Sequence, residues 1–502
     1  MNRFTILMTA MILTAPVLTA TPPAISQDDL VLLPVKNDPT ISFRIWFKVG
    51  SQNDPKGKEG LASLTASMLT DASTKSNTYE QVLDKLYPLA AGYSASTSVE
   101  MTVISGRTHK DNLEAYYPLL LDAVLRPAFA SADLERIRSQ VLNHLENTLR
   151  YASDEDLGKA VLYNDLFAGS GYGHITEGLV QSVKSITLED ISSFYAKYYT
   201  AENVVIGLAG GYDASLLDML RKDLAELPSA AVEPAPVPTP VQFKGMQVTI
   251  VEKDAPATAI SMGFPMSVLR GSREWYALAI ANSWLGEHRN SSSHLYKVIR
   301  ETRGLNYGDY SYIENFPNGS RLQMPPQNVA RRKQIFEIWI RPVPNEAAHF
   351  SIRAALREFS MLVKNGMSES DFQLTRNFLR KYVLHFAPTT MERLGYALDD
   401  RFYGIEGSHL ENFRKMMDEI TVDEVNAAIR KHWQYGNMQI AIVTSNAEEL
   451  KKALVADASS PITYTAPKPA EVLAEDEKII GFKLGIKADD VKVVPVAGLF
   501  ER

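Results

Sequence analysis

Cysteine is missing from all 502 residues of the chain. Its absence excludes disulfide bonds, thiolate ligands for a metal, a cysteine nucleophile and a lipid-bearing cysteine near the N-terminus. An excess of basic residues is missing too, because 52 Lys and Arg stand against 59 Asp and Glu, for a net charge of −7. Such a chain has no overall attraction for nucleic acid or anionic lipid. We therefore expect no nucleic-acid partner, and we interpret the compact basic cluster at residues 331–333 as a solvated surface turn.

Long apolar runs are scarce as well. The clearest one follows Arg3 and covers residues 6–18, and small residues continue to Ala20. This stretch is too short to span a bilayer and is typical of a cleaved export signal. The sequence therefore predicts a signal peptide at about residues 1–20, a periplasmic mature protein, and no membrane association after the signal is removed.

One predicted helix has positions spaced as in a metal site, but the side chains at those positions are not metal ligands. Residues 60–69 predict a helix in which Ser63, Ala66 and Ser67 fall at i, i+3 and i+4 and so share one face. Two histidines and a glutamate at those positions would form an H-x-x-E-H zinc motif, with the glutamate as the base. Serine and alanine cannot hold Zn²⁺ at neutral pH. We therefore expect no metal and no other cofactor in this chain.

Proline is concentrated in one place, and the sequence repeats on either side of it. Five prolines lie between residues 228 and 240, which predicts an extended linker. Capped helix starts at Thr187 and Thr421 each precede a strand-like run, and we expect duplication of one α+β unit. The expected organisation is a signal peptide at residues 1–20, a first domain at 28–227, the linker at 228–241, a second domain at 242–455, and a tail packed on the second domain at 456–502.

Other local patterns complete the expected elements of the first domain. Small and β-branched residues at 94–103 predict a strand, and residues 113–125 predict a helix. A second helix is expected from residue 134 to about 150, after a cap formed by Ser131 and Asp133. His174 and Glu177 have H-x-x-E spacing, but the glycines around them predict a loop, which argues against a metal site.

The residues around the vacant helix face resemble a known family. Residues 47–51 and 60–69 are similar to the segment that brackets the zinc motif in M16 peptidases, the family of pitrilysin, insulin-degrading enzyme and mitochondrial processing peptidase. In this resemblance Ser63 and Ser67 occupy the histidine positions, Ala66 that of the glutamate base, and His144 that of a third, glutamate ligand. All four are substituted. The resemblance implies an α+β fold of two homologous domains, each a mixed or antiparallel sheet with helices packed on one face, as in the LuxS/MPP-like metallohydrolase fold.

The second half resembles the same family at residues 300–307, which match an R-E-x-R-G-L-x-Y signature. The resemblance implies that Arg300 and Tyr307 help to hold the substrate peptide and the tetrahedral intermediate. Guanidinium and phenol groups suit that role because both donate hydrogen bonds to an oxyanion. A structural role for the pair, packing a helix end onto a sheet, is the alternative. By the same resemblance, Ser94, Ser96 and Ser98 lie on an edge strand that pairs with extended substrate, or else on an ordinary sheet strand.

A missing zinc motif combined with a retained Arg/Tyr pair is what the resemblance implies for one subunit of a two-component peptidase. The expected partner is an M16 homologue with H-x-x-E-H and bound Zn²⁺, in a heterodimer or a larger assembly that cleaves unfolded peptides. The chain alone would be inactive. An inert scaffold or peptide-binding protein of the same fold is the alternative. An autonomous hydrolase has no nucleophile motif of the G-x-S-x-G or S-x-x-K type behind it.

Overall fold

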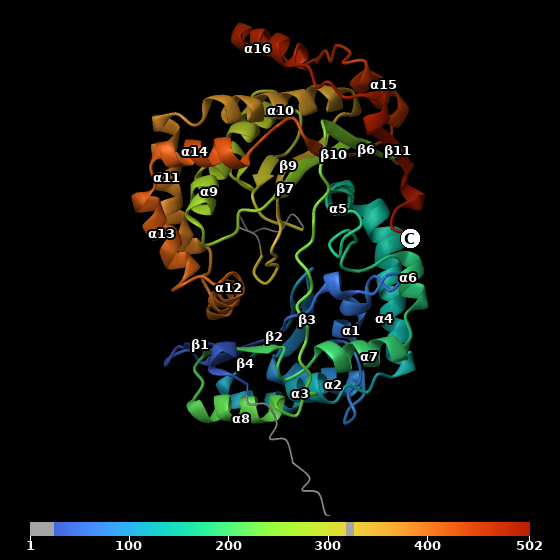
Figure 1. Cartoon of the computed structure of the whole chain (residues 1–502), viewed down its shortest axis with the longest axis vertical. Coiled ribbons are helices and arrows are strands. Elements are labelled where there is room, and N and C mark those ends of the chain that lie inside the picture. Colours follow the sequence, from blue (N-terminus) through green and yellow to red (C-terminus); the bar gives the residue numbers. More distant parts are fainter. Residues whose placement is uncertain (1–24, 318–325) are drawn as a thin grey trace, which may run out of the picture.

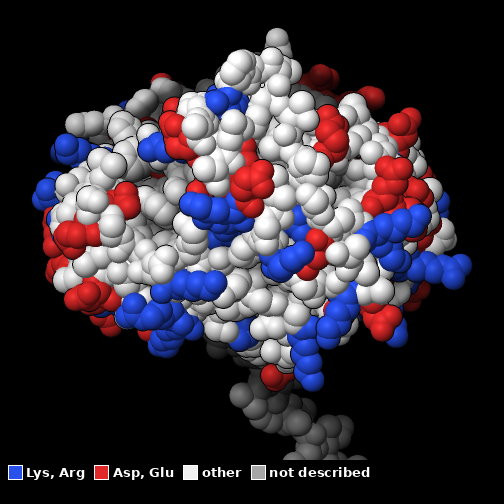
Figure 2. Space-filling view, turned by 90° about the horizontal axis from the view of Figure 1, so that it is seen from above, with Lys and Arg blue, Asp and Glu red and all other residues white. Residues whose placement is uncertain are grey.

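The computed structural model describes residues 25–317 and 326–502, so the expected signal peptide at residues 1–20 lies outside the described residues. The chain forms two halves stacked along its long axis, each built around one β-sheet (Figure 1). Within the described residues, no helix is both long enough and apolar enough to cross a membrane. Acidic and basic side chains are interspersed over the face seen in Figure 2, as the small net charge leads one to expect.

The first sheet has the strand order β1-β5-β2-β4-β3. Its strands are β1 (Leu30–Pro34), β2 (Thr40–Phe47), β3 (Gly92–Thr97), β4 (Thr102–His109) and β5 (Val204–Gly210). β1 runs parallel to β5, and the other neighbours are antiparallel. In β2, Phe43 and Phe47 are buried on one face and Trp46 on the other. Because side chains alternate along a strand, both faces of this sheet must be covered.

The second sheet repeats the first and adds one strand. Its order is β11-β6-β10-β7-β9-β8. The strands are β6 (Met246–Glu252), β7 (Thr258–Met266), β8 (Asp309–Tyr312), β9 (Gln334–Val343), β10 (Met438–Thr444) and β11 (Val491–Pro495). Without β11, the neighbours and their directions are those of the first sheet, with β8 in the place of β3. The expected α+β fold of two homologous units is confirmed.

Each sheet has helices of its own half on one face. Those of the first half are α1 (Leu61–Thr70), α2 (Tyr79–Leu86), α3 (Leu113–Leu125), α4 (Ser131–Asn143), α6 (Val180–Ser185), α7 (Leu188–Tyr198) and α8 (Ala214–Leu224). Those of the second are α9 (Arg273–Gly286), α10 (Ala348–Asn365), α11 (Glu369–Tyr382), α13 (His409–Glu419), α14 (Val422–His432) and α15 (Ala447–Val455), and α16 (Ala470–Ile480) packs outside them on α10. Thr187 and Thr421 cap α7 and α14 with capping boxes, as predicted.

The remaining face of each sheet is covered by a helix from the other half. The helix α5 (Asp154–Leu166) packs on β7 and β10, and α12 (Thr390–Tyr403) packs on β1, β5 and β2. In Figure 1 the teal α5 lies beside the second sheet, and the orange α12 lies above the first. The ring centroids of Trp46 and Phe402 are 5.9 Å apart across this contact. The halves are therefore interlocked by an exchange of equivalent helices.

Two local expectations differ from the structure. The strand expected at residues 94–103 is two antiparallel strands, β3 and β4, because the chain turns between them. Ser98 closes that turn, where its amide donates to the carbonyl of Met101 at 2.7 Å. The expected cap at Ser131 and Asp133 is also wrong. α4 starts at Ser131 without a side-chain cap, because Asp133 instead accepts from the amide of Ser73 at 2.9 Å.

The tail does not pack on the second half alone. Its strand β11 pairs with β6 and so extends the second sheet. Its last residues reach the first half, where the amide of Val180 donates to the carbonyl of Phe500 at 2.9 Å and that of Gln181 to Glu501 at 3.1 Å. Arg150 donates to the carbonyl of Leu499 at 3.0 Å. The tail therefore joins the two halves.

Candidate functional site

The helix with the vacant zinc positions has a firmly held N-terminus. The buried carboxylate of Asp54 accepts from the amides of Gly60 and Ala62, both at 2.7 Å, so it caps α1 from six residues upstream of Gly60. His174 Nε2 lies 3.1 Å from the same carboxylate. Burial raises the pKa of Asp54, against the opposing effect of His174. The H-x-x-E spacing at His174 and Glu177 thus belongs to a loop that clamps α1.

Close backbone packing reinforces this clamp. Gly60 and Gly178 both have positive φ, and a Cβ on Gly60 would lie 2.6 Å from the carbonyl oxygen of Glu177. A Cβ on Gly178 would lie 2.2 Å from the carbonyl oxygen of Glu59. Glycine is required at both positions because two backbones meet there. The start of α1 is therefore fixed in place although its metal ligands are missing.

The structure places Ser63, Ala66 and Ser67 on one helix and His144 on another, and it builds no metal site from them. Ser63 and Ser67 are half-buried on α1, and Ala66 is buried at 2% exposure. His144 is half-buried where α4 passes into a π-helical turn, His144–Ala152. Across residues 25–317 and 326–502, no group of three or more His, Asp or Glu side chains could hold a metal ion. Within that part of the chain, the donor set therefore does not fit zinc.

The strand proposed to pair with substrate lies at the edge of the first sheet. β3 is the outermost strand, and its Ser94 and Ser96 are exposed. The amide of Ala95 is engaged, since it donates to Thr70 Oγ1 of α1 at 3.2 Å. Ser98 is buried in the turn after β3, so it does not belong to the exposed edge.

Arg300 and Tyr307 lie on either side of a tight turn that leads into the edge strand β8. Arg300 is in a π-helical turn, Tyr296–Glu301, and its guanidinium lies 5.2 Å from the centroid of the Tyr296 ring. Tyr307 is 79% exposed, the second most exposed of the large apolar side chains described. A side chain this exposed contributes little to packing. The geometry therefore does not support packing of a helix end as the role of Tyr307.

The residues between Arg300 and Tyr307 are held in place by hydrogen bonds. Arg303 is buried, and its Nη1 donates to the carbonyl of Val298 at 2.7 Å. Asn306 is buried too, and its Nδ2 donates to Asp309 Oδ1 at 2.8 Å and to the carbonyl of Arg341 at 3.0 Å. Tyr307 thus projects from a turn whose neighbours are held by hydrogen bonds.

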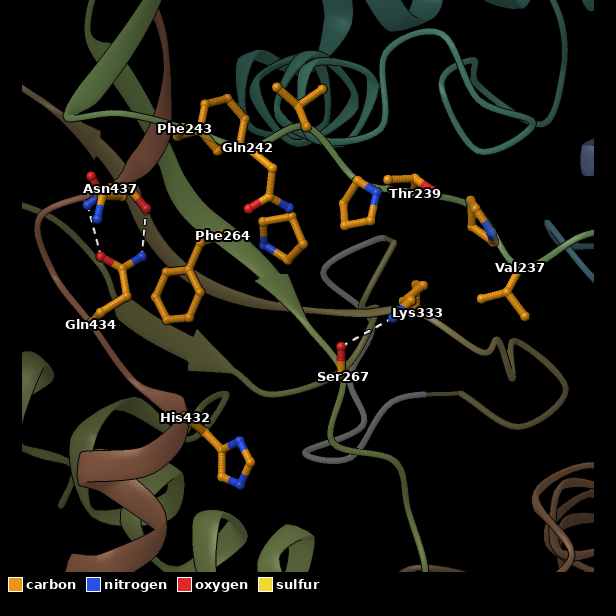
Figure 3. A pocket seen from close by; sticks show the side chains of 14 residues that line it. Val237, Thr239, Gln242, Phe243, Phe264, Ser267, Lys333, His432, Gln434 and Asn437 are labelled. Carbon is orange, nitrogen blue, oxygen red and sulfur yellow. Dashed lines mark hydrogen bonds between the residues drawn. The ribbon is translucent and has the colours of Figure 1, made fainter.

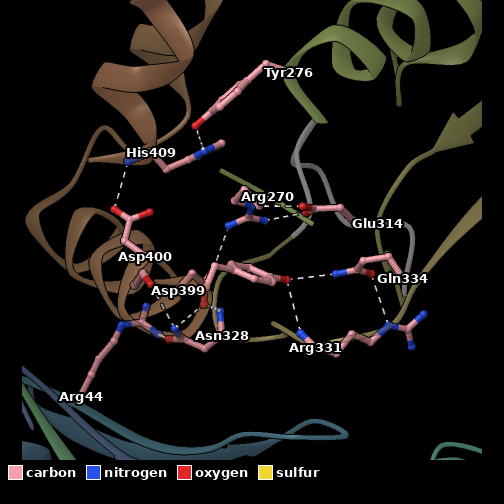
Figure 4. A network of polar contacts seen from close by, with 12 residues as sticks. Arg44, Arg270, Tyr276, Glu314, Asn328, Arg331, Gln334, Asp399, Asp400 and His409 are labelled. Atoms are coloured by element: carbon pink, nitrogen blue, oxygen red, sulfur yellow. Dashed lines mark hydrogen bonds and ion pairs between the residues drawn. The ribbon is translucent and has the colours of Figure 1, made fainter. Parts of the chain in front are cut away.

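A buried polar network joins the halves near α12 (Figure 4). Arg270 pairs with Glu314 at 2.7 Å and with Asp399 of α12 at 3.1 Å. The Asn328 amide donates to Asp399 at 2.9 Å, and Arg44 of β2 donates to the Asn328 side chain. The network thus links the first sheet to a helix of the second half.

The basic cluster at residues 331–333 belongs to the same interface, which corrects the expected surface turn. Arg331 is buried with its guanidinium 5.3 Å from the Phe167 ring centroid. Arg332 pairs with Glu100 of the first half at 2.6 Å. Arg331 therefore packs against an aromatic ring and Arg332 binds a carboxylate, so the cluster is not simply a solvated turn.

A second link between the halves is a fully buried ion pair. Lys159 of α5 lies 2.9 Å from Glu337 of β9, at exposures of 1% and 0%. Tyr163 also donates to this carboxylate at 2.8 Å, and the rings of Tyr312 and Trp339 lie 4.4 and 4.6 Å from the ammonium. Burial lowers the pKa of Lys159, and Glu337 opposes that shift. Sequence patterns gave no sign of this pair.

The Pro-rich linker borders an open cavity of about 720 Å³ at the second sheet (Figure 3). Its other walls come from the end of β7, the start of β9 and the end of α14. Lys333 Nζ donates to Ser267 Oγ at 3.1 Å inside it, and His432 pairs with Glu274 at 2.6 Å. Both side chains are thus already engaged, and no metal-ligand set lines the cavity among the described residues.

Sequence profiles of one peptidase family match both halves. The profile described as Insulinase (Peptidase family M16) matches residues 30–177. The profile described as Peptidase M16 inactive domain matches residues 185–379.

Curated relatives cover most of the chain. An uncharacterized zinc protease of Mycobacterium bovis is 26% identical over 395 residues, which are 78% of this chain and 85% of the relative. The non-peptidase homolog YmxG of Helicobacter pylori is 22% identical over 415 residues, 80% of this chain and 88% of the relative.

Solved structures share the fold. A peptidase M16 inactive domain from Pseudomonas fluorescens has a TM-score of 0.72 and 24% identity, and the match covers 82% of this chain and 94% of that one. A protease from Helicobacter pylori has a TM-score of 0.67 and 17% identity, with 83% and 96% covered.

Proposed function

The chain belongs to the M16 peptidase family, and on that premise we propose that it is the non-zinc-binding subunit of a heteromeric M16 metallopeptidase. The observation that carries the proposal is a contrast between the two halves. The helix α1 is kept and clamped but presents Ser63, Ala66 and Ser67, whereas Tyr307 is exposed on a turn held by hydrogen bonds. The similarity to a non-peptidase homolog supports a role without autonomous catalysis.

In the proposed assembly the two chains contribute different groups. A partner with H-x-x-E-H would supply Zn²⁺ and the water that it activates. Arg300 and Tyr307 would donate hydrogen bonds to the scissile carbonyl of an unfolded peptide, and these bonds would strengthen as that oxygen gains charge. The edge strand β3 would receive the extended peptide, with Ser94 and Ser96 beside it. We place the assembly, a heterodimer or a larger complex, in the periplasm.

A second candidate is an inert scaffold or peptide-binding protein of the same fold. The interlocked halves favour it, because two exchanged helices and buried ion pairs make a stable framework whether or not catalysis occurs. The two candidates differ in what Arg300 and Tyr307 do within a complex.

Co-expression with an H-x-x-E-H homologue from the same genome tests the proposal. We expect the complex to cleave fluorescein-labelled casein, and each chain alone to be inactive. Arg300→Ala should lower kcat by about 10²–10³, the usual cost of losing one donor to an oxyanion. Assembly, measured by size-exclusion chromatography, should not change.

The exposed Arg414 of α13 offers a matched control. Arg414→Ala removes the same charge from the same half and should leave turnover unchanged. If Arg300→Ala and Tyr307→Phe both retained full activity in the complex, the scaffold would be the better interpretation.

A further inference from the structure

The tail is an addition that only the second half carries. The first half ends with α8 and passes directly into the linker, whereas the second continues beyond the corresponding helix α15 to α16 and β11. Duplication therefore does not account for the tail, and its contacts indicate what it does.

The tail contacts the turn between Arg300 and Tyr307 at two points. Asp476 of α16 accepts from Arg303 Nε at 2.8 Å. Lys468, just before α16, donates to the carbonyl of Thr302 at 2.6 Å. Both contacts fall on residues that separate the two proposed substrate-binding side chains.

Tyr464 contacts both tail residues that bind the turn. Tyr464 donates to the second oxygen of Asp476 at 2.8 Å, and its ring centroid lies 5.0 Å from the ammonium of Lys468. Arg303 and Asp476 are 5% and 4% exposed. A hydrogen-bonded ion pair buried to this degree holds its geometry well, because breaking it would leave a charge uncompensated in the interior.

We propose that the tail segment from Tyr464 to Asp476 positions the Arg300–Tyr307 turn. Arg303, Tyr464, Lys468 and Asp476 are positioning residues in this proposal, and Asn306 fixes the opposite side of the turn from within the second half. Donors aimed at a developing charge are effective only when held in place beforehand. The consequence for catalysis rests on the function proposed above, whereas the ordering of the turn does not.

Hydrogen–deuterium exchange on the purified full-length chain tests the ordering without a partner. Asp476→Asn keeps the shape of the side chain but removes its charge. We expect amides in residues 302–308 to exchange about tenfold faster or more, because the buried guanidinium of Arg303 loses its negatively charged partner. Tyr464→Phe should give a smaller increase in exchange in the same residues. This variant tests the proposal if Asp476→Asn fails to fold.

The control is Glu477→Gln, which makes the equivalent change on the next, exposed residue of α16 and should leave exchange as in the wild type. If exchange in residues 302–308 did not respond to either tail variant, the proposal would be wrong. It would also be wrong if exchange rose equally throughout the second half, since the pair would then stabilise the domain rather than position the turn.

A double-variant comparison in the reconstituted complex tests the catalytic consequence. Asp476→Asn should lower kcat for labelled casein by about tenfold in the wild-type background and have little effect once Arg300 and Tyr307 are replaced by Ala and Phe. Equal losses in both backgrounds would contradict positioning. If Arg300→Ala and Tyr307→Phe both retained full activity in the complex, the proposed function would be wrong, but the exchange result would still stand.

Discussion

Arg300 and Arg303 are three residues apart in one signature, yet their environments are opposite. Arg303 is buried against Asp476, whereas Arg300 is half-buried over an aromatic ring. Among the described residues no ion pair engages Arg300, so its guanidinium can donate to a ligand. The resemblance singled out Arg300 and Tyr307, but nothing in the sequence indicated that Arg303 is held by a segment over 170 residues away.

Glu287 is a second residue whose environment gives it unusual chemistry. It follows α9 and is buried, with Ser283 and Asn290 donating to its Oε2 at 3.0 and 2.9 Å. Burial raises its pKa to about 7, because the charged form loses its hydration, and these hydrogen bonds oppose the shift. The folded protein therefore binds a proton there that the unfolded chain releases at about pH 4.5.

This linkage predicts a dependence of stability on pH. A carboxyl group whose pKa is raised by folding contributes most below its unfolded pKa, and that contribution is lost as pH rises to 7. Glu287 should thus lower the free energy of unfolding by about 3 kcal/mol between pH 4.5 and 7. Glu287→Gln stays neutral and should remove this fall, so that its stability relative to the wild type improves from pH 5 to pH 8.

Urea midpoints at pH 5, 6.5 and 8 would measure the effect. Glu346→Gln, a change to an exposed glutamate of the same half, is the control and should keep the pH dependence of the wild type. Parallel pH profiles for the wild type and Glu287→Gln would show that Glu287 is charged in the folded protein at neutral pH.

At the scale of elements, α1 keeps the helix position of a metal site although it carries none of the metal ligands. Asp54 and the Gly60–Gly178 contact fix the start of the helix, so its face keeps a defined position without any ion. Ser63 and Ser67 remain partly accessible on that face, one helical turn apart.

Replacing these two serines should therefore create a metal site. Two imidazoles at i and i+4 on one helix face can chelate Zn²⁺. We expect Ser63→His/Ser67→His to bind one Zn²⁺ or Co²⁺ per chain in a calorimetric titration, with no peptidase activity because Ala66 supplies no base. Ser67→His alone should bind far more weakly. No difference between the double and single variants would mean that the two side chains do not converge.

Elements with a local signal were predicted well, and elements defined by distant contacts were not. Thr187 and Thr421 carry their capping partners three residues away, and proline sets the extended linker by itself. The pattern at residues 94–103 predicts one strand rather than the hairpin of β3 and β4, because Ser98 and Met101 form the turn without glycine or proline between them. The substituted zinc motif could be found from spacing on α1, whereas the clamp from His174 depends on a contact across 120 residues.

For the whole molecule, the exchange of α5 and α12 matters most. Each half completes its neighbour's core, since Trp46 of the first sheet packs on Leu398 and Phe402 of α12. The linker joins the halves covalently, and the tail connects them through hydrogen bonds. A duplication is visible in the sequence, but the exchange is not, because an amphipathic helix does not specify which of two equivalent sheets it covers.

Variants of the buried pair of Lys159 and Glu337 can test whether the exchanged helices couple the two halves. Lys159→Met removes the charge supplied by α5 and leaves Glu337 of the second sheet uncompensated. We expect a loss of about 3–5 kcal/mol in the free energy of unfolding. Because the pair joins the halves, hydrogen exchange at the urea midpoint should show both sheets unfolding together, at a lower urea concentration than in the wild type.

Two further variants serve as controls for Lys159→Met. Lys159→Met/Glu337→Met removes both charges and should recover most of the loss, since a buried ion pair is often no better than apolar packing. Lys184→Met, which breaks a solvent-exposed pair with Glu146, should cost less than about 1 kcal/mol. If Lys159→Met destabilised the second sheet while the first kept its wild-type midpoint, the halves would fold separately and the exchanged helices would not couple them.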